Sequence, residues 1–359
     1  LNEMIFNMLY LANQGVDIVR LDAVPYIWKQ LGTNCRNLPQ VHTIVRIMRM
    51  ICEIVCPGVL LLGEVVMAPE KVVPYFGTVE KPECHLLYNV TTMASTWHTV
   101  ATKDVSLLRR QLDIISELPR DYVFQNYLRC HDDIGWGLDY EYLENFGIQE
   151  VPHKKYLNDF LTGKYPDSFA RGELYNDDPR LGDARLCGTT ASLCGIERFG
   201  FEGNQEGVNR AVRYDITLHA FMLSQSGIPV IYSGDEIGQV NDYSYKDDPE
   251  KSDDSRYLHR GKFDWKLAEN RHDPATVQGK LFPVLDKLEH IRSSHGIFNS
   301  NVPIHTIDTW DNSILAFVRE NDEEKFIGIY NFSENDKVAW INEEDGMYTD
   351  LISGREMEA

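Results

Sequence analysis

The sequence predicts an α/β fold with a parallel central sheet. Over the first 136 residues, short apolar segments alternate with longer segments whose apolar residues recur at helical spacing. Three of the short segments end in an acidic residue. From residue 302 onward the pattern changes to that of antiparallel strands with polar turns. We therefore expect a parallel sheet or barrel that carries acids at one rim, followed by a small antiparallel β domain.

Helices and strands alternate through the N-terminal part. The expected elements are a helix over 2–14, a strand over 16–22, a helix over 39–56, strands over 60–65 and 86–90, a helix over 105–118 and a strand over 124–130. Strands that are separated by helical crossovers are typically parallel neighbours. The carboxyl ends of these strands should therefore meet at one edge of the sheet.

Residues 137–204 interrupt the alternation with Gly, Asp, Tyr and Pro in no clear period. At nearly 70 residues this region is too long for a plain connection, so we expect an inserted subdomain. The expected elements after it are a helix over 206–226, a strand over 229–233, a helix over 274–295 and antiparallel strands over 314–318 and 326–330. The expected domains are 1–136, the insertion 137–204, 205–298 and the β domain 299–359.

The first strand ends in two charged residues that lie two positions apart. Arg20 and Asp22 should share a face where the strand meets a loop, because side chains alternate along a strand. A carboxylate kept ionised by a neighbouring guanidinium has the properties of a catalytic nucleophile. A purely structural ion pair at a strand end is the alternative for this segment alone.

The two later acids suggest glycoside chemistry when combined with Asp22. Glu64 follows an apolar run and has no adjacent cation in the sequence, which favours a carboxyl that holds a proton near neutral pH. Asp132 could then stabilise an oxocarbenium-like transition state, and His131 could bind sugar hydroxyls. Taken alone, the sequence His131-Asp132-Asp133 is equally consistent with a loop turn or a helix N-cap.

Composition narrows the class of protein. The 359-residue chain has a formal net charge of −20, which argues against nucleic acid and anionic membranes as partners. Its seven cysteines include no Cys-x-x-Cys pair, which favours reduced thiols and a cytoplasmic location. We expect no cofactor and no metal-ligand cluster, and we interpret the acids at 247–248 and 253–254 as a solvated loop rather than a calcium site.

Three strings resemble signature regions of the α-amylase family (glycoside hydrolase family 13), in that family's order. They are Gly15–Val24, Gly63-Glu64-Val65-Val66 and His131–Trp136. Longer strings resemble the amylosucrase branch of the family. These strings are residues 26–33, 37–40, 168–172, 182–185 and 251–256.

The resemblance implies roles for individual residues. It makes Asp22 the nucleophile, Glu64 the acid/base and Asp132 the transition-state stabiliser. Arg20 and His131 match residues that bind the glucosyl ring. These roles agree with those argued above from the residues themselves.

Three further residues correspond to binding positions. Asp133 and Arg185 match residues near the fructosyl moiety, and Arg256 matches an Arg that pairs with an Asp at the bottom of the pocket. For both arginines a solvated surface position is the alternative. The branch often has an Arg after the His of the insertion, but this chain has Lys154, which puts tight binding of a polymeric acceptor in doubt.

The resemblance also implies the architecture. The family's fold is a TIM (β/α)8 barrel, and this chain corresponds to about strands 4–8 of it. The family's first signature region is absent from the chain, as is the Asp expected to pair with Arg256. We expect two open sheet edges and the missing N-terminal part of the barrel as a partner.

The function expected from the resemblance is glucosyl transfer from sucrose to an α-glucan or oligosaccharide acceptor, with a covalent glucosyl-enzyme on Asp22. A sucrose hydrolase or another α-glucosidase of the family is the alternative within enzymes, because loops decide the acceptor. An inactive fragment or a carbohydrate-binding remnant is the alternative of another class.

Overall fold

The computed structural model describes residues 1–67, 69–178 and 184–358. Its centre is one parallel sheet in the order β1-β2-β5-β6-β9. The strands are β1 (Ile18–Leu21), β2 (Leu60–Gly63), β5 (Leu86–Tyr88), β6 (Val123–Asn126) and β9 (Ile228–Pro229). All four neighbouring pairs are parallel. The predicted α/β fold with a parallel sheet is confirmed.

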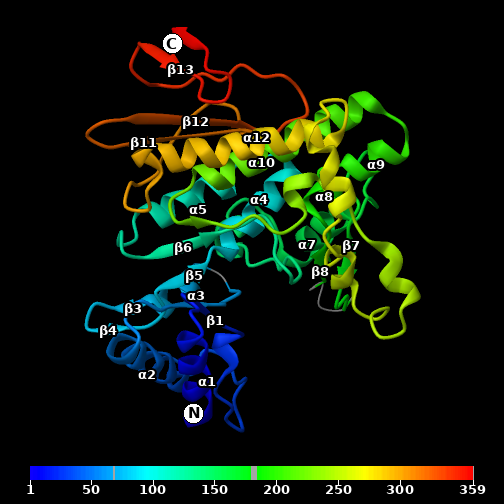
Figure 1. Cartoon of the computed structure of the whole chain (residues 1–359). Helices are drawn as coiled ribbons and strands as arrows, with labels where there is room; N and C mark the ends of the chain where they lie inside the picture. Colours follow the sequence, from blue (N-terminus) through cyan, green and yellow to red (C-terminus); the bar gives the residue numbers. More distant parts are fainter. Residues whose placement is uncertain (68, 179–183, 359) are drawn as a thin grey trace.

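Two helices pack near the first strands. These are α1 (Asn2–Asn13) and α2 (Pro39–Val55), the blue helices beside the N-terminus in Figure 1. In α2 the buried residues Val41, Val45, Met48 and Cys52 are three or four positions apart, so they lie on one face. Pro39 occupies the first turn, where its missing N–H costs no hydrogen bond.

Helix α4 (Val90–Thr102) has no counterpart among the expected elements. Residues 90–101 are all buried. Val90, Met93, Ala94 and Trp97 do recur at helical spacing, but the residues between them are mostly Thr and Ser, which have modest helix propensity. Trp97 is fully buried in it and donates its indole N–H to the carbonyl oxygen of Leu128 at 2.7 Å. This bond ties α4 to the segment that follows β6. The next helix, α5 (Ser106–Ser116), is amphipathic as expected.

Residues 137–204 form short elements of their own. They are α6 (Tyr140–Glu144), α7 (Glu150–Leu161), the antiparallel pair β7 (Glu173–Tyr175) and β8 (Arg185–Cys187), α8 (Thr190–Leu193) and α9 (Ile196–Phe201). Leu157 and Leu161 of α7 are buried in the main hydrophobic core. Gly182 and Asp183, from one of the amylosucrase-like strings, lie outside the described residues.

Two long helices follow, α10 (Gln205–Ser224) and α12 (Val277–Ser294). The short connecting elements are η1 (Val24–Tyr26), α3 (Pro69–Val72), η2 (Val73–Phe76), β3 (Gly77–Thr78), β4 (Lys81–Pro82), η3 (Asp235–Ile237), η4 (Tyr243–Asp247), η5 (Ser255–His259), α11 (Trp265–Ala268), η6 (Glu269–His272) and η7 (Gly296–Phe298). None of the helices in the described residues is long and apolar enough to cross a membrane.

The C-terminal part is antiparallel, as the sequence predicts. Its strands are β10 (His305–Ile307), β11 (Ile314–Glu320) and β12 (Lys325–Asn331), followed by the hairpin β13 (Met347–Thr349) and β14 (Glu356–Glu358). Phe317 of β11 packs against Phe221 of α10 with ring centroids 6.5 Å apart. The hairpin lies at the opposite end of the molecule from the N-terminus (Figure 1).

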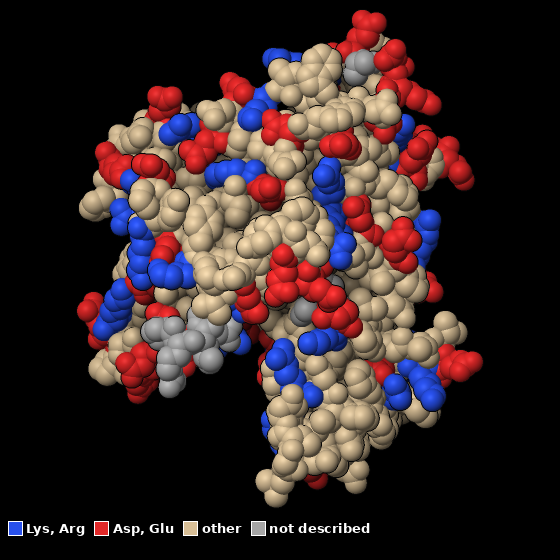
Figure 2. Space-filling view, turned by 180° about the vertical axis from the view of Figure 1, so that it is seen from behind, with Lys and Arg blue, Asp and Glu red and all other residues tan. Residues whose placement is uncertain are grey.

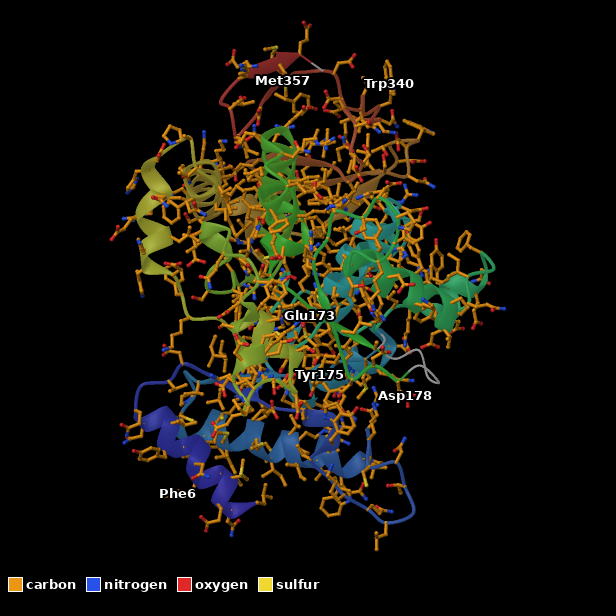
Figure 3. The ribbon with its side chains drawn as sticks, turned by 90° about the vertical axis from the view of Figure 1, so that its right-hand side faces the viewer. Phe6, Glu173, Tyr175, Asp178, Trp340 and Met357 are labelled. Atoms are coloured by element: carbon orange, nitrogen blue, oxygen red, sulfur yellow. The ribbon has the colours of Figure 1, made fainter. Side chains whose placement is uncertain are left out.

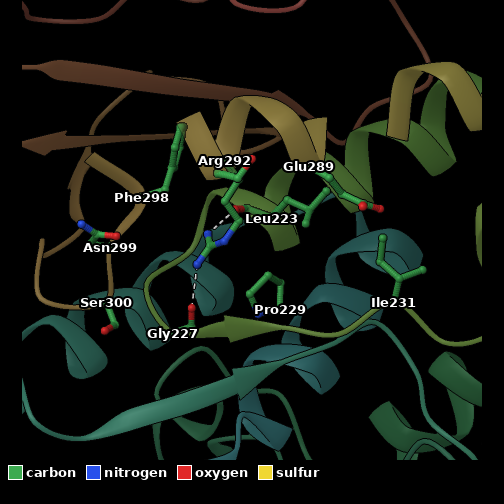
Figure 4. A pocket seen from close by; sticks show the side chains of 10 residues that line it. Leu223, Gly227, Pro229, Ile231, Glu289, Arg292, Phe298, Asn299 and Ser300 are labelled. Carbon is green, nitrogen blue, oxygen red and sulfur yellow. Dashed lines mark hydrogen bonds between the residues drawn. The ribbon is translucent and has the colours of Figure 1, made fainter. Parts of the chain in front are cut away.

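Strands β1 and β9 are the two edges of the central sheet, and they do not pair with each other. Ile18 on β1 is 42% exposed, and Val230, just after β9, is 40% exposed. A cavity of about 590 Å³ lies beside β9, between it, α12 and η7 (Figure 4). Arg292 enters this cavity and donates to the carbonyl oxygens of Leu223 and Gly227. Because the edge strands β1 and β9 do not pair with each other, the sheet is open at both edges.

Candidate active site

The three acids singled out in the sequence meet at the carboxyl rim of the sheet. In the β1–β2 ladder Leu21 pairs with Gly63, and the N–H of Glu64 donates to the carbonyl oxygen of Leu21 at 3.0 Å. Asp22 and Glu64 are the residues that follow this pair on the two strands. Asp132 arrives from the segment after β6. The structure therefore places all three on one rim, as expected.

Arg20 is the centre of this group. Its guanidinium lies 2.7 Å from Asp22 Oδ1, 3.1 Å from Glu64 Oε1 and 3.6 Å from Asp132 Oδ2. Its Nε–H donates to the hydroxyl of Tyr88, at the end of β5, at 3.1 Å. Burial lowers the pKa of Arg20, but the hydrogen bond to Asp22 and the charge of Glu64 outweigh it and raise the pKa above its ordinary value.

Glu64 has a cation beside it, contrary to the expectation that none lies near. The sequence reading considered only chain neighbours, whereas Arg20 reaches Glu64 from the adjacent strand. Glu64 also accepts the backbone N–H of Ala23 at 2.8 Å. Ala23 adopts the left-handed region with φ of 44°, which is uncommon for a residue with a side chain. The turn after Asp22 therefore helps to hold Glu64.

Gly63 allows β2 to pass close to its neighbour. A Cβ atom at this position would lie 2.6 Å from Cys84 Sγ and 2.9 Å from a methyl carbon of Leu87. A larger residue would force the side chains of Cys84 and Leu87, or the strand end that carries Glu64, to shift. The glycine therefore favours the observed position of this strand end.

Asp132 is surrounded by donors. Its Oδ1 lies 3.4 Å from Arg256 and 3.1 Å from Arg260, and its Oδ2 lies 3.0 Å from Nε2 of His131. Arg260 was not among the residues identified from the sequence. Arg260 lies four positions after Arg256, in a segment that the sequence already suggested for substrate binding. This spacing was the signal that could have identified it.

A buried ion pair orders the segment that leads to His131. Arg129 contacts Asp235 at 2.8 Å, and both side chains are 2% exposed. Arg129 also donates to the carbonyl oxygen of His259 at 3.3 Å. This pair joins the chain after β6 to η3 and to the end of η5. Sequence reasoning missed it because the two partners are 106 positions apart.

Asp133 and Arg185 contact each other at 3.3 Å. Burial raises the pKa of Asp133, and the positive charge of Arg185 opposes this shift. Arg256 contacts Asp254 at 2.7 Å, and its guanidinium carbon lies 4.5 Å from the ring centroid of Tyr175 on β7, labelled in Figure 3. Its carboxylate partners within the described residues are thus Asp254 and Asp132, and neither arginine is a fully solvated surface residue.

A cavity of about 760 Å³ opens beside Glu64. It is lined by Ala23, Tyr26, Glu64, Trp136, Tyr140 and Lys154, among others. It therefore runs from the acid/base candidate along residues of the insertion.

The side chain of Asp22 is 75% exposed, whereas that of Glu64 is 18% exposed. Acidic side chains are numerous on the face shown in Figure 2, in keeping with the net charge of −20.

The donor atoms of Cys130, His131 and Asp132 lie within 4.8 Å of one another. The expectation that the chain has no metal-ligand cluster is therefore wrong as a statement about geometry. The three residues are consecutive, but a bend after β6 turns their side chains together. Spacing in the sequence does not show such an arrangement.

Comparison with known sequences identifies relatives but no matching family model. The chain is 30% identical over 297 residues to glucosylglycerate phosphorylase of Spirochaeta thermophila, covering 81% of the chain and 46% of the relative. It is 28% identical over 348 residues to glucosylglycerate phosphorylase of Escherichia coli, covering 96% and 58%. It is 29% identical over 236 residues to trehalose synthase of Thermus thermophilus, covering 64% and 20%. The chain spans about half the length of the first two relatives.

Solved structures show the same fold. Sucrose 6F-phosphate phosphorylase from Thermoanaerobacter thermosaccharolyticum superposes with a TM-score of 0.68 at 20% identity, covering 99% of this chain and 62% of that one. An alpha-amylase from H. orenii superposes with a TM-score of 0.56 at 17% identity, covering 99% and 61%. The likeness to these solved structures is one of fold.

Proposed function

The chain is related to enzymes of the α-amylase family (glycoside hydrolase family 13), and we propose that it carries the catalytic residues of a retaining, amylosucrase-like glucosyl transfer. The observation that supports this most directly is the contact of Asp22 and Glu64 with one guanidinium, that of Arg20. Retaining cleavage needs two carboxyl groups about 5–5.5 Å apart, one as nucleophile and one as acid/base.

In the proposed reaction, Asp22 attacks the anomeric carbon of the glucosyl unit of sucrose as Glu64 protonates the departing oxygen. A covalent glucosyl-enzyme on Asp22 results. Glu64 then removes a proton from the acceptor hydroxyl, which displaces Asp22 with net retention. The hydrogen bond that Arg20 donates to Asp22 Oδ1 at 2.7 Å orients this carboxylate for the attack.

The other residues surround the sugar in this proposal. Asp132 stabilises the positive charge that develops on the ring, while Arg20 and His131 bind its hydroxyls. Asp133 and Arg185, in contact with each other, bind the fructosyl unit. The contacts of Arg256 with Asp132 and Asp254 have a separate role, which is to hold the floor of the pocket.

The cavity beside Glu64 is where we place the acceptor. Its aromatic lining, including Tyr26 and Tyr140, suits the faces of glucose rings in an α-glucan or oligosaccharide. A second candidate acceptor is phosphate, because two of the relatives are named phosphorylases. Lys154 and Arg185 line the same cavity and offer positive charge there. Water as the acceptor would make the protein a sucrose hydrolase.

We propose that the sheet is part of a TIM (β/α)8 barrel, about strands 4–8, completed by polypeptide outside the sequence described. The open edges at β1 and β9 and the greater length of the relatives support this. In this proposal, the barrel strands and helices are formed by residues 1–136 and 205–298. The insertion is 137–204, and the C-terminal β domain is 299–359. We propose a cytoplasmic enzyme with no nucleic-acid or membrane partner.

The test is incubation of the protein that contains this chain with sucrose, with and without glycogen or phosphate. Fructose, free glucose, glucan and glucose 1-phosphate are measured separately. Glucan supports the leading proposal, glucose 1-phosphate the second, and free glucose alone the hydrolase. Asp22→Asn should abolish fructose release, with Asp308→Asn, an exposed acid of the β10–β11 loop, as the control. Near-normal release by Asp22→Asn excludes the assigned nucleophile, and no release by the wild type leaves the carbohydrate-binding alternative.

A further inference from the structure

Three side chains of different donor chemistry meet just beyond β6. Cys130 offers a sulfur, His131 a ring nitrogen and Asp132 a carboxylate oxygen, and these atoms lie within 4.8 Å of one another. Over residues 1–67, 69–178 and 184–358, no other group of three such side chains is found at this separation. The proposed glucosyl transfer uses His131 and Asp132 but has no role for Cys130.

The local contacts already hold these atoms close together. The backbone N–H of Asp132 donates to Cys130 Sγ at 3.4 Å, and His131 Nε2 lies 3.0 Å from Asp132 Oδ2. The buried pair of Arg129 and Asp235 anchors the chain immediately before the group. The side chain of His131 is 45% exposed, so an ion can reach the group from solvent.

The ligand set favours one class of cation. Sulfur, nitrogen and oxygen ligands bind Zn²⁺ at about 2.0–2.3 Å, so tetrahedral ligands lie roughly 3.3–3.8 Å from one another. His131 Nε2 and Asp132 Oδ2 lie 3.0 Å apart, slightly closer than that range, and all three donor atoms lie within 4.8 Å of one another. Hard cations such as Mg²⁺ and Ca²⁺ prefer all-oxygen sites. Three protein ligands leave a fourth position for water, as in open zinc sites.

The neighbouring arginines oppose a cation, and one of them, Arg20, lies near the oxygen that the cation needs. Arg256 and Arg260 both contact Oδ1 of Asp132, whereas His131 faces Oδ2. Arg20 lies 3.6 Å from Oδ2 and is itself shared with other carboxylates. Repulsion from these cations weakens binding, so we expect a reversible site rather than a permanently occupied structural one.

We propose that Cys130, His131 and Asp132 form a binding site for a divalent cation of the Zn²⁺ class. Coordination engages Asp132 and His131, which the proposed reaction needs for the sugar, so occupancy inhibits turnover. The inhibition rests on the proposed function, whereas the binding does not.

The binding test is a titration of the protein that contains this chain with Co²⁺, read by absorption. A Co²⁺–thiolate charge-transfer band should form, and Zn²⁺ but not Mg²⁺ should abolish it. Cys130→Ser should remove the band and weaken Zn²⁺ binding roughly tenfold or more. Cys35→Ser, at a half-buried free thiol outside the group, is the matched control and should change neither.

His131→Asn provides a second variant at an exposed side chain, where misfolding is not a concern, and it should also weaken Zn²⁺ binding. A band that survives Cys130→Ser, or no band in the wild type, overturns the site. Sucrose turnover with and without Zn²⁺ is measured in parallel. Turnover unaffected by saturating Zn²⁺ overturns the inhibitory role. A protein with no turnover at all refutes the proposed function, while the absorption titration still decides the site.

Discussion

Replacement of Arg20 by Lys is the sharpest perturbation that the site offers. The guanidinium contacts Asp22, Glu64 and Asp132 at once and also donates to the hydroxyl of Tyr88. A lysine ammonium is a point charge on a flexible stem and cannot reproduce this fork. We expect it to keep one of the carboxylate contacts and to lose the others.

The size of the effect follows from the exposure of each partner. Asp22 is 75% exposed, so its contact with Arg20 is strongly discounted for solvent screening. The contacts with Glu64 and Asp132 are half-buried, with side-chain exposures of 18% and 27%. The contact with Glu64 at 3.1 Å is worth about 1.5 kcal/mol and the hydrogen bond to Tyr88 about 1 kcal/mol, whereas the 3.6 Å contact with Asp132 is too long for a hydrogen bond and adds about 0.5 kcal/mol. The total of about 3 kcal/mol corresponds to roughly a 100-fold fall in kcat/KM.

The assay is fructose release from sucrose, followed as kcat and KM, with thermal unfolding to confirm that the variant is folded. Arg109→Lys is the matched control, because Arg109 forms a single ion pair with Asp308 at 3.3 Å on the surface. That control should leave kcat/KM unchanged. If folded Arg20→Lys keeps kcat/KM within about threefold of the wild type, the central role of the guanidinium is refuted.

Three further predictions concern stability. Burial lowers the pKa of His98 to about 3 from an ordinary 6.5, so the unfolded state takes up its proton first and the free energy of unfolding falls below pH 6.5. His98→Gln should reduce this fall by about 2 kcal/mol in total in urea titrations between pH 7 and 5, and an unchanged slope contradicts the assignment. Arg319→Met should lower the free energy of unfolding by about 3 kcal/mol or more in chemical unfolding, because three backbone carbonyls lose their buried donor. The control Arg213→Met, at an exposed arginine, should lower it by less than about 0.5 kcal/mol. Trp97→Ala should lower the free energy of unfolding by about 3–5 kcal/mol, because Trp97 is fully buried. Trp265→Ala should lower it far less, because Trp265 is 77% exposed. Equal losses in the two variants would contradict the packing of α4.

The sequence predicts those parts of the site in which chain neighbours carry the signal. Arg20 and Asp22 are two positions apart on one strand, so alternation alone brings them together, and the structure confirms their contact at 2.7 Å. The strand ends at Glu64 and before His131 are also visible as apolar runs. Parallel pairing then brings the acids to one rim.

The unpredicted parts depend on long-range contacts. Arg20 and Glu64 meet only because β1 and β2 pair in one particular register. Arg129 and Asp235 neutralise each other in the interior although they are far apart in the chain. Helix α4 (Val90–Thr102) was not predicted although its apolar residues recur at helical spacing, because Thr and Ser, which have modest helix propensity, make up much of the segment and tertiary packing stabilises the helix.

The spacing between Asp22 and Glu64 is a property of two paired strands and of one left-handed turn at Ala23. It does not depend on the loops after β6, which line the neighbouring cavity. Trp136 and Tyr140 line that cavity, whereas His131 and Asp132 of the same segment do not. In the proposed reaction, substitutions at Trp136 and Tyr140 can therefore alter which acceptor binds without moving the two carboxyl groups that cleave the bond.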